Sequence, residues 1–244
     1  MKAPLPLILA VWILFLTLLT NASAVDFTTV EIAGNRFTVC RVNVRNEHLQ
    51  LFNTDENNQP FKRFDRLAAW LHTHGQTLLF AMNAGMYKPD FSPLGLFVSN
   101  SRQLVPLNIS TGASNFFLKP NGVFALANTG AKVLKSSDYN RNHVTLATQS
   151  GPLLVCDGTI NPAFNPISKS RLYRNGVGVA SPDAAIFVIT ETPVNFHEFA
   201  TLFRDTLHCP NALFLDGTIS SLYSTTLKRD DFRMDLGTII AVTE

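Results

Sequence analysis

The stretch that decides the fold is Asn211-Ala212-Leu213-Phe214-Leu215-Asp216-Gly217-Thr218-Ile219-Ser220-Ser221-Leu222-Tyr223. Its apolar run, 212–215, is short and stops at Asp-Gly, which predicts a buried strand that ends in a turn. A carboxylate at the end of a buried strand stands on a rigid support, as a catalytic acid or base requires. Asp-Gly is also an ordinary turn pair, in which Asp216 would only cap the backbone. The rest of the chain has to distinguish these interpretations.

The same four letters, Asp-Gly-Thr-Ile, occur a second time at 157–160. There they join two apolar runs, 152–156 and 159–160, which predicts the turn of a β-hairpin. The copy at Asp216 has no second apolar arm and leads instead into hydroxyl residues. We therefore interpret Asp157 as a turn residue and Asp216 as a candidate site residue.

Two segments have the apolar spacing of helices. The segment at about 195–207 precedes the strand that leads to Asp216, and its Asn195 and Glu198 resemble a capping box. The segment from Pro60 to Gly75 has Pro in its first turn and Gly just past its end, as helix termini favour. Both segments are expected to pack an apolar face on sheets.

The remaining chain alternates short apolar runs with turn residues, which indicates hairpins. The expected strands are 27–32, 37–44, 49–52, 77–82, 93–98, 104–107, 120–125, 131–134, 151–155, 176–179, 185–190, 212–215 and 237–242. The predicted fold class is α+β, with mixed, mostly antiparallel sheets built from hairpins and helices packed on them in a single domain.

The N-terminus has the pattern of a secretory signal peptide. Lys2 precedes an apolar core at 5–19, and Ala22-Ser23-Ala24 ends the segment. The predicted organisation is a signal peptide at 1–24 and one domain at 25–244. The alternative is an uncleaved anchor, for which the apolar core is short. Cleavage predicts an exported protein, periplasmic or secreted, without stable membrane insertion.

Composition excludes several classes of protein. The chain has 244 residues, 46% hydrophobic and 16% charged, which is typical of a folded domain and not of a disordered one. The net charge of +2 falls to +1 without Lys2, so nothing favours nucleic acid as a partner. The sequence does not indicate an oligomeric state.

The chain has three cysteines, Cys40, Cys156 and Cys209, whose spacing matches no metal motif. Export permits one disulfide, for which we take Cys156–Cys209 with Cys40 as a buried thiol. Three buried free thiols are equally compatible with the sequence. No His-Glu-x-x-His, Gly-x-Ser-x-Gly, Walker lysine loop or dinucleotide motif is present, so we predict no cofactor and no metal.

Four short motifs occur together in a fixed order. They are Asn83-Ala84-Gly85-Met86-Tyr87, Gln149-Ser150-Gly151-Pro152-Leu153-Leu154, Arg174-Asn175-Gly176-Val177-Gly178 and Leu215-Asp216-Gly217-Thr218-Ile219-Ser220-Ser221. In order and spacing they resemble the phosphodiester glycosidase family, and the resemblance covers 76–242. The family pattern has Asn-Gly-Gly-Phe/Tyr at the first motif and Asp-Gly-Gly-Gly-Ser at the last. Thr218 and Ile219 replace two of those glycines, which crowds the backbone beside the site and prevents transfer of a particular substrate.

The resemblance implies hydrolysis of the bond between a sugar's anomeric carbon and a phosphodiester oxygen. Phosphate is a good leaving group, so the reaction needs a carboxylate at the anomeric centre more than a strong acid. The implied nucleophile or general base is Asp216, with Glu191 as its partner carboxylate. Arg174 is the implied phosphate ligand, because a guanidinium can bind two phosphate oxygens, and Arg171 is a second cation. The implied substrate-binding residues are Asn83, Tyr87 (as a platform for a sugar face), Gln149, Ser150, Asn175, Gly217 and Ser220.

The expected partner is a sugar phosphate or a glycan, in the cell envelope or outside the cell. Two other functions remain open. The first is a non-catalytic glycan-binding or envelope-binding domain of the same fold, which the altered loop after Asp216 would suit. The second is a phosphodiesterase that cuts the P–O bond instead of the anomeric bond.

Overall fold

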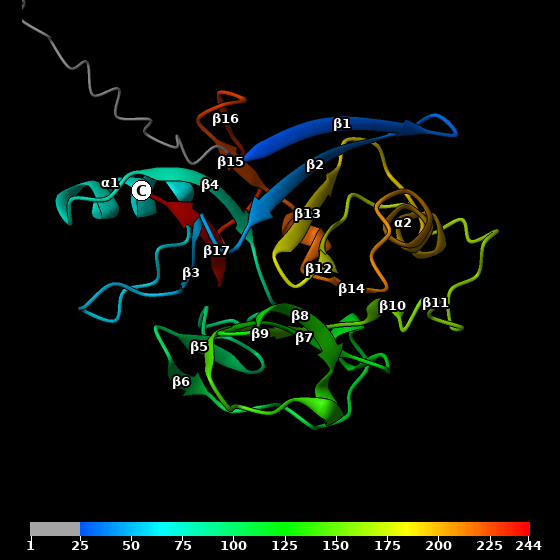
Figure 1. Cartoon of the computed structure of the whole chain (residues 1–244), viewed down its shortest axis with the longest axis horizontal. Helices are drawn as coiled ribbons and strands as arrows, with labels where there is room; N and C mark the ends of the chain where they lie inside the picture. The colour runs from blue at the N-terminus through cyan, green and yellow to red at the C-terminus, as the bar shows by residue number, and fades with distance from the viewer. Residues whose placement is uncertain (1–24) are drawn as a thin grey trace, which may run out of the picture.

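The computed structural model describes residues 25–244, and the predicted signal peptide lies outside this range. Three sheets meet around a common core (Figure 1), and every pairing between their strands is antiparallel. The predicted α+β fold built from hairpins is therefore confirmed. Within the described range, no helix is both long enough and apolar enough to cross a membrane.

The first sheet has seven strands, and one of them is the strand that leads to Asp216. Its order is β1 (Asp26–Ile32), β2 (Asn35–Asn43), β13 (Ala184–Thr190), β12 (Asn175–Ser181), β14 (Asn211–Phe214), β10 (Leu153–Cys156) and β11 (Thr159–Ile160). Its central strands β13 and β14 are mostly apolar because both of their faces are buried. The edge strand β1 is mostly exposed and polar, as sheet edges usually are.

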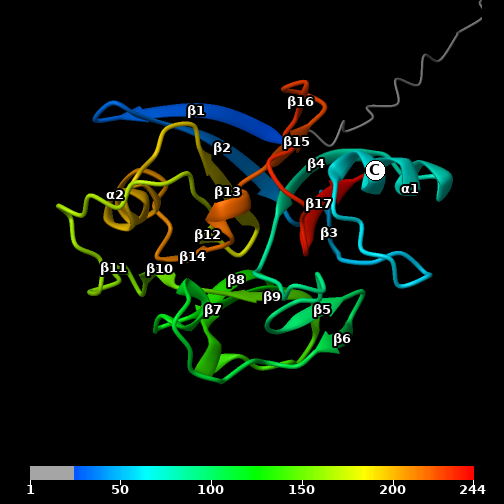
Figure 2. The same ribbon diagram turned by 180° about the vertical axis from the view of Figure 1, so that it is seen from behind.

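The other two sheets have five strands each. The second sheet runs β16 (Arg229–Asp230), β15 (Leu222–Ser224), β4 (Leu78–Asn83), β17 (Ile239–Thr243) and β3 (His48–Phe52). The third runs β6 (Arg102–Val105), β5 (Phe97–Ser99), β9 (Val144–Ser150), β7 (Gly122–Ala127) and β8 (Gly130–Lys135). Seen from the front and from behind, the third sheet lies below the first two (Figures 1 and 2).

Helices cover the outer faces of the first two sheets (Figure 2). Helix α1 (Phe64–Thr73) packs on the second sheet through its buried apolar face. Helix α2 (Phe196–Thr201) continues into a π-helical turn, η3 (Leu202–Thr206), and packs on the first sheet. The predicted capping box at Asn195 and Glu198 is confirmed, because each side chain accepts a hydrogen bond from the other's backbone N–H.

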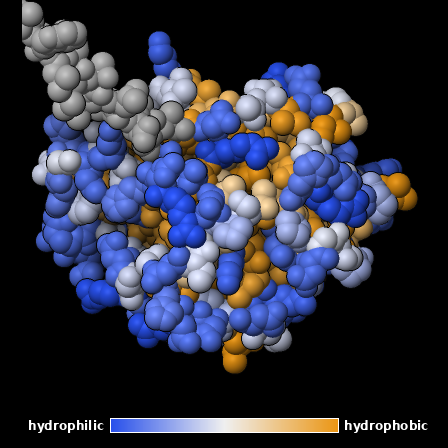
Figure 3. Space-filling model, in the orientation of Figure 1, coloured by the Kyte–Doolittle hydropathy of each residue, from blue (hydrophilic) through white to orange (hydrophobic). Residues whose placement is uncertain are grey.

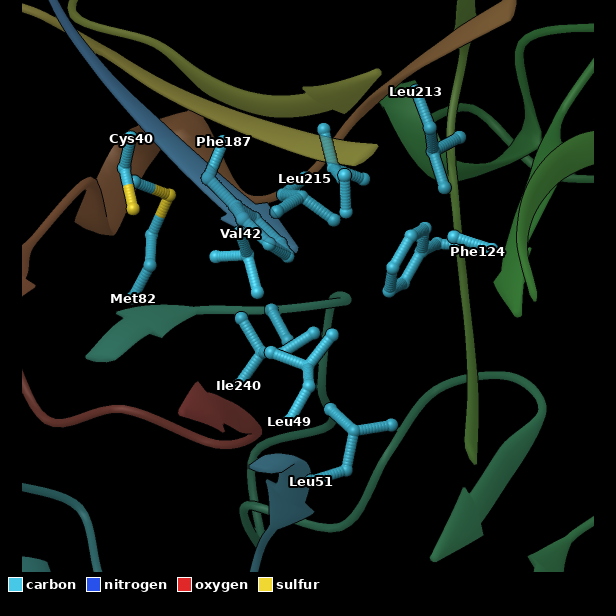
Figure 4. Packing of buried hydrophobic residues seen from close by; sticks show 14 of the residues in the cluster. Cys40, Val42, Leu49, Leu51, Met82, Phe124, Phe187, Leu213, Leu215 and Ile240 are labelled. Atoms are coloured by element: carbon cyan, nitrogen blue, oxygen red, sulfur yellow. The ribbon is translucent and has the colours of Figure 1, made fainter. Parts of the chain in front are cut away.

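The central core fills the space between the three sheets (Figure 4). Leu213 and Leu215 point into it from the first sheet, Met82 and Ile240 from the second, and Phe124 from the third. The surface in the view of Figure 3 is mostly hydrophilic, with hydrophobic residues showing between polar ones near its centre. Leu215 is thus fixed by packing on all sides, and it holds the backbone next to Asp216.

The first predicted helix begins later than the sequence indicated. Pro60 pairs with Thr54 in an isolated bridge, and Lys62 adopts a positive φ of 64°, which a helix does not accommodate. Helix α1 therefore starts at Phe64, and Gly75 follows its end with a φ of 72°, as predicted. The second Asp-Gly, at Asp157, is the β10–β11 hairpin turn that the sequence predicted.

The predicted Cys156–Cys209 disulfide is wrong, since all three cysteines are free thiols. Cys156 packs on the central core, whereas Cys209 packs under η3 on the opposite face of the first sheet. Their side chains therefore face away from each other, which no disulfide geometry permits. Burial raises the pKa of Cys209 to about 12 and raises that of Cys40 well above its usual value.

Candidate active site

The backbones of the three residues predicted to be catalytic lie at one end of the first sheet. Arg174 immediately precedes β12, Glu191 immediately follows β13, and Asp216 lies two residues beyond β14. Because β12 is antiparallel to both neighbours, its start lies beside their ends. The backbones of Thr190 and Arg174 confirm this proximity, with a 2.9 Å hydrogen bond from the Thr190 N–H to the Arg174 carbonyl.

Asn83, at the end of β4, links this end of the first sheet to the second sheet. Its Nδ2 donates to the Asp216 carbonyl at 2.8 Å. Its Oδ1 accepts from the Asn175 side chain and from the Ser221 backbone N–H, both at 3.0 Å. Asn175 Nδ2 also donates to the Asn83 carbonyl at 2.8 Å. Both asparagines are fully buried, so their observed contacts position the Asp216 loop.

Ser150 and Ser220 complete this polar network. Ser150 ends β9 of the third sheet and donates to the Leu215 carbonyl at 3.3 Å. Ser220 Oγ lies 2.8 Å from the Gly217 carbonyl and 3.5 Å from Asn175 Oδ1, so the former is its stronger acceptor. All three sheets thus contribute a polar side chain to the hydrogen-bond network that holds the Asp216 loop.

Gly217 allows the Asp216 loop to pack tightly. A Cβ at this position would lie 2.8 Å from the Phe214 ring and 3.0 Å from the Tyr173 carbonyl. The loop then turns through a short 3₁₀ segment, η4 (Gly217–Ile219). Thr218 and Ile219 occupy positions where the family pattern has glycines. Ile219 is buried in the core beneath α1 and Thr218 is exposed, so neither side chain blocks the loop's backbone.

The Asp216 carboxyl group is mostly buried and forms no ion pair with any described residue. Desolvation raises its pKa to about 6, and the Thr218 backbone N–H opposes this rise. A buried carboxylate without a cation is costly, and such groups concentrate at functional sites.

Arg174 is a buried cation, only 2% exposed. Its guanidinium stacks on Phe196 at 3.7 Å from the ring centroid and lies 5.7 Å from that of Phe214. Nε donates to the Val194 carbonyl at 2.9 Å, whereas Nη1 has no hydrogen-bond partner among the described residues. Desolvation lowers the Arg174 pKa to about 10, partly offset by the Glu198 carboxylate.

Glu191 lies in a separate charged cluster beside this end of the first sheet. Its Oε1 accepts from Thr38 at 2.7 Å and forms an ion pair with Arg229, which also pairs with Asp231. Glu191 Oε2 has no hydrogen-bond partner among residues 25–244. The structure therefore holds the Glu191 carboxylate against Thr38 and Arg229, without a contact to the Arg174 guanidinium among residues 25–244, and leaves Oε2 unengaged there.

Tyr87 is half-buried near Asp216. Desolvation raises its pKa, with further contributions from the Asp216 and Asp235 carboxylates. Its ring stacks on Phe91 with centroids 5.5 Å apart, and its hydroxyl donates to the Asp235 carbonyl at 2.8 Å. Phe91 already covers part of the ring, which limits its use as a sugar platform.

Two predicted substrate-binding residues are engaged elsewhere. Gln149 is buried, and its side-chain amide bonds to both backbone polar groups of Asn108, to the Leu96 N–H and to the Ser136 hydroxyl. Arg171 pairs with Glu198 at 2.6 Å and donates to Asn35 at 2.7 Å. These contacts give Gln149 and Arg171 structural roles in the absence of substrate.

The sequence did not single out two arginines beside this site. Arg229 holds Glu191, as described above, and Arg233 lies 4.3 Å from the ring centroid of Tyr173, whose carbonyl packs on the Asp216 loop. Their segment, 229–235, is rich in charged residues, and this was the only sign in the sequence that it could belong to a site. It has no regular spacing of apolar residues from which its position in the fold could be predicted. In the described range, no three His, Cys, Asp or Glu side chains are grouped as a metal site would need.

The fold and the motifs define the class of protein. The family model for phosphodiester glycosidases matches residues 76–243, more than half of the chain, and the chain belongs to this family. It is 34% identical over 183 residues to the uncharacterised protein YigE of Escherichia coli, covering 75% of this chain and 72% of that protein.

Solved structures of low sequence identity share the fold. The zebrafish N-acetylglucosamine-1-phosphodiester α-N-acetylglucosaminidase catalytic domain, auto-inhibited by its pro-peptide, superposes with a TM-score of 0.61 and 13% identity, covering 90% of this chain and 82% of that one. A putative exported protein of Burkholderia pseudomallei superposes with a TM-score of 0.60 and 10% identity, covering 85% and 74%.

Asn83→Ala is expected to destabilise the protein by about 2 kcal/mol, because it leaves buried partners such as the Ser221 N–H unsatisfied. Urea denaturation measures the change. The exposed Asn142 provides the control, and Asn142→Ala should leave the free energy of unfolding within about 0.5 kcal/mol of wild type. Equal stability of the two variants would contradict the positioning role of Asn83.

Proposed function

We propose that this protein is a hydrolase that cleaves the anomeric bond of a sugar-1-phosphodiester. Family membership supports the reaction class. The observation that carries the proposal is Asp216, a desolvated carboxyl group with no ion pair to any residue of 25–244. It lies at the meeting point of three sheets, in the motif where the resemblance expects the catalytic residue.

Asp216 acts as nucleophile at the anomeric carbon or as general base for the attacking water. Either role needs the ionised form, and a pKa of about 6 keeps the group mostly ionised at neutral pH while making it more basic than an ordinary Asp. Desolvation also strengthens its attraction to the positive charge that develops on the sugar. Asn83 fixes the carbonyl of the same residue and so limits movement of the carboxyl group.

Arg174 stabilises the negative charge on the departing phosphate. It lies beside the Asp216 loop, has no carboxylate ion pair, and keeps Nη1 without a partner in the described chain. Glu191 is the partner carboxylate, with Oε2 left to orient water or a sugar hydroxyl. In this scheme the sugar is not contacted by the side chains of Asn175, Ser150 and Ser220, which shape the loop. Gly217 shapes it by allowing tight packing.

The substrate is a glycan or sugar phosphate outside the cytoplasm. The pattern of residues 1–24 supports export, and the fold resembles that of a protein described as a putative exported protein. Thr218, where the family pattern has a glycine, is exposed two residues from Asp216 and favours a substrate that differs from that of the zebrafish enzyme.

Product analysis tests the proposal against its alternatives. The purified protein is incubated with α- and β-linked methyl phosphodiesters of glucose-1-phosphate and N-acetylglucosamine-1-phosphate. Free reducing sugar together with methyl phosphate is the expected outcome. Sugar-1-phosphate with methanol would instead establish a phosphodiesterase, and binding without turnover of any substrate would establish a glycan-binding domain.

A further inference from the structure

A pocket of about 510 Å³ opens in the surface beside the third sheet, and its lining includes none of the residues proposed for the candidate active site. It lies at the start of β7 and the end of β8, and it is lined by Asn108, Ile109, Lys119, Pro120, Asn121, Lys135, Ser136 and Ser137. Two of these residues are cations and none is a carboxylate. The lining therefore favours an anion on charge alone.

The pocket has donors that the protein does not use. The Lys119 ammonium donates to Asn121 Oδ1 at 3.3 Å, which leaves its other protons free. The Lys135 ammonium lies 3.8 Å from the Asp157 carboxylate, beyond hydrogen-bonding distance, and both groups are well exposed. The nearly buried Ser136 hydroxyl accepts from Gln149 at 3.2 Å and donates to no described residue.

The floor of the pocket is rigid. Gln149 ties Ser136 to both backbone polar groups of Asn108. Asn121 is buried, and its side-chain amide donates to the Phe116 carbonyl at 3.1 Å. Its backbone carbonyl accepts a hydrogen bond from the Ser136 N–H, also at 3.1 Å. A preorganised site loses less entropy when a ligand binds.

We propose that this pocket is a phosphate-binding site, in which Lys119, Lys135 and the Ser136 hydroxyl hold the phosphate oxygens. Lysine binds phosphate as a point charge, and a hydroxyl with a free proton adds a directed hydrogen bond. The phosphate belongs either to a phosphodiester-linked polymer or to free phosphate, because both present charged non-bridging oxygens. This site does not depend on hydrolysis at Asp216.

Calorimetric titration tests the site with two probes, inorganic phosphate and a synthetic glycerol phosphate trimer joined by phosphodiesters. The titrations use the Asp216→Asn protein, so that turnover of either probe cannot interfere and failure of the proposed function leaves the result interpretable. Saturable binding is expected, and a combined Lys119→Gln and Lys135→Gln substitution should weaken it at least about tenfold.

Lys132 supplies the matched control, because it is exposed on the same strand, β8, but does not line the pocket. Lys132→Gln should bind both probes as its parent does. Tighter binding of the trimer than of phosphate identifies a phosphodiester-linked polymer as the source, and the reverse order identifies free phosphate. Absence of saturable binding, or equal binding by the parent and the double lysine variant, overturns the proposal.

Discussion

Asp216→Asn is expected to lower the rate of sugar-1-phosphodiester hydrolysis by about a thousandfold or more, as removal of a catalytic carboxylate does in other hydrolases. Asparagine keeps the shape of the side chain but supplies neither a nucleophile nor a base. Because Asn83 holds the backbone carbonyl and not the carboxyl group, the loop should keep its conformation. Steady-state kinetics on the substrate identified by product analysis measures the loss, which should appear in kcat.

The chain contains its own control for this substitution. Asp157 has the same Asp-Gly-Thr-Ile context but forms the β10–β11 hairpin turn with a positive φ of 48°, which asparagine also adopts readily. Asp157→Asn should keep the wild-type rate within a factor of about two. A comparable rate in Asp216→Asn and Asp157→Asn would remove Asp216 from the mechanism.

Asp216→Asn is also expected to stabilise the protein by about 2 kcal/mol at pH 7. Desolvation raises the Asp216 pKa from 3.8 to about 6 in the folded state, so ionisation of this group opposes folding. A shift of about two units corresponds to about 3 kcal/mol, and the remaining contact with solvent reduces it to about 2 kcal/mol. Asparagine carries no charge and avoids this cost.

The sign of the effect sets its pH dependence. Between about pH 4 and pH 6 the folded protein binds a proton that the unfolded chain has lost, so the Asp216 contribution to stability falls as pH rises. Below about pH 4 the carboxyl group is protonated in both states and the cost disappears. The gain from Asp216→Asn should therefore be largest at pH 7 and fade towards pH 4.

Urea denaturation of wild type, Asp216→Asn and Asp157→Asn at pH 4 and pH 7 measures this difference. Asp157 is exposed in its turn, so its substitution should change little at either pH. A gain for Asp216→Asn that is equal at both pH values, or a loss at pH 7, would mean that the Asp216 carboxylate is not desolvated in the folded protein. Stability sacrificed at a carboxyl group is expected where that group serves catalysis.

Much of the fold could be predicted because its signals are local. Hairpin turns, the capping box at Asn195 and the apolar run before Asp216 each depend on a few neighbouring residues. The start of α1 was missed because the positive φ of Lys62 follows from tertiary contacts that hold Phe61, whose N–H donates to the Asn53 carbonyl. The wrong disulfide has a similar cause, since the face of the sheet on which Cys209 packs depends on η3.

The site was predicted in part for the same reason. Residues at strand ends, such as Asn83 and Asp216, are recognisable where an apolar run stops. Which polar groups remain free after folding is a tertiary property. Gln149 satisfies its amide in the third sheet, and Arg229 reaches Glu191 across two sheets. Neither contact has a local signature in the sequence.

The central claim is that the protein cleaves at the anomeric carbon, and hydrolysis in ¹⁸O-labelled water tests it most directly. Attack at this carbon, whether by water or through a sugar ester of Asp216, places the label on the C1 hydroxyl of the released sugar. Mass spectrometry of both products locates the label. We predict ¹⁸O in the sugar and none in the phosphomonoester, whereas ¹⁸O in the phosphate product would contradict the proposed reaction.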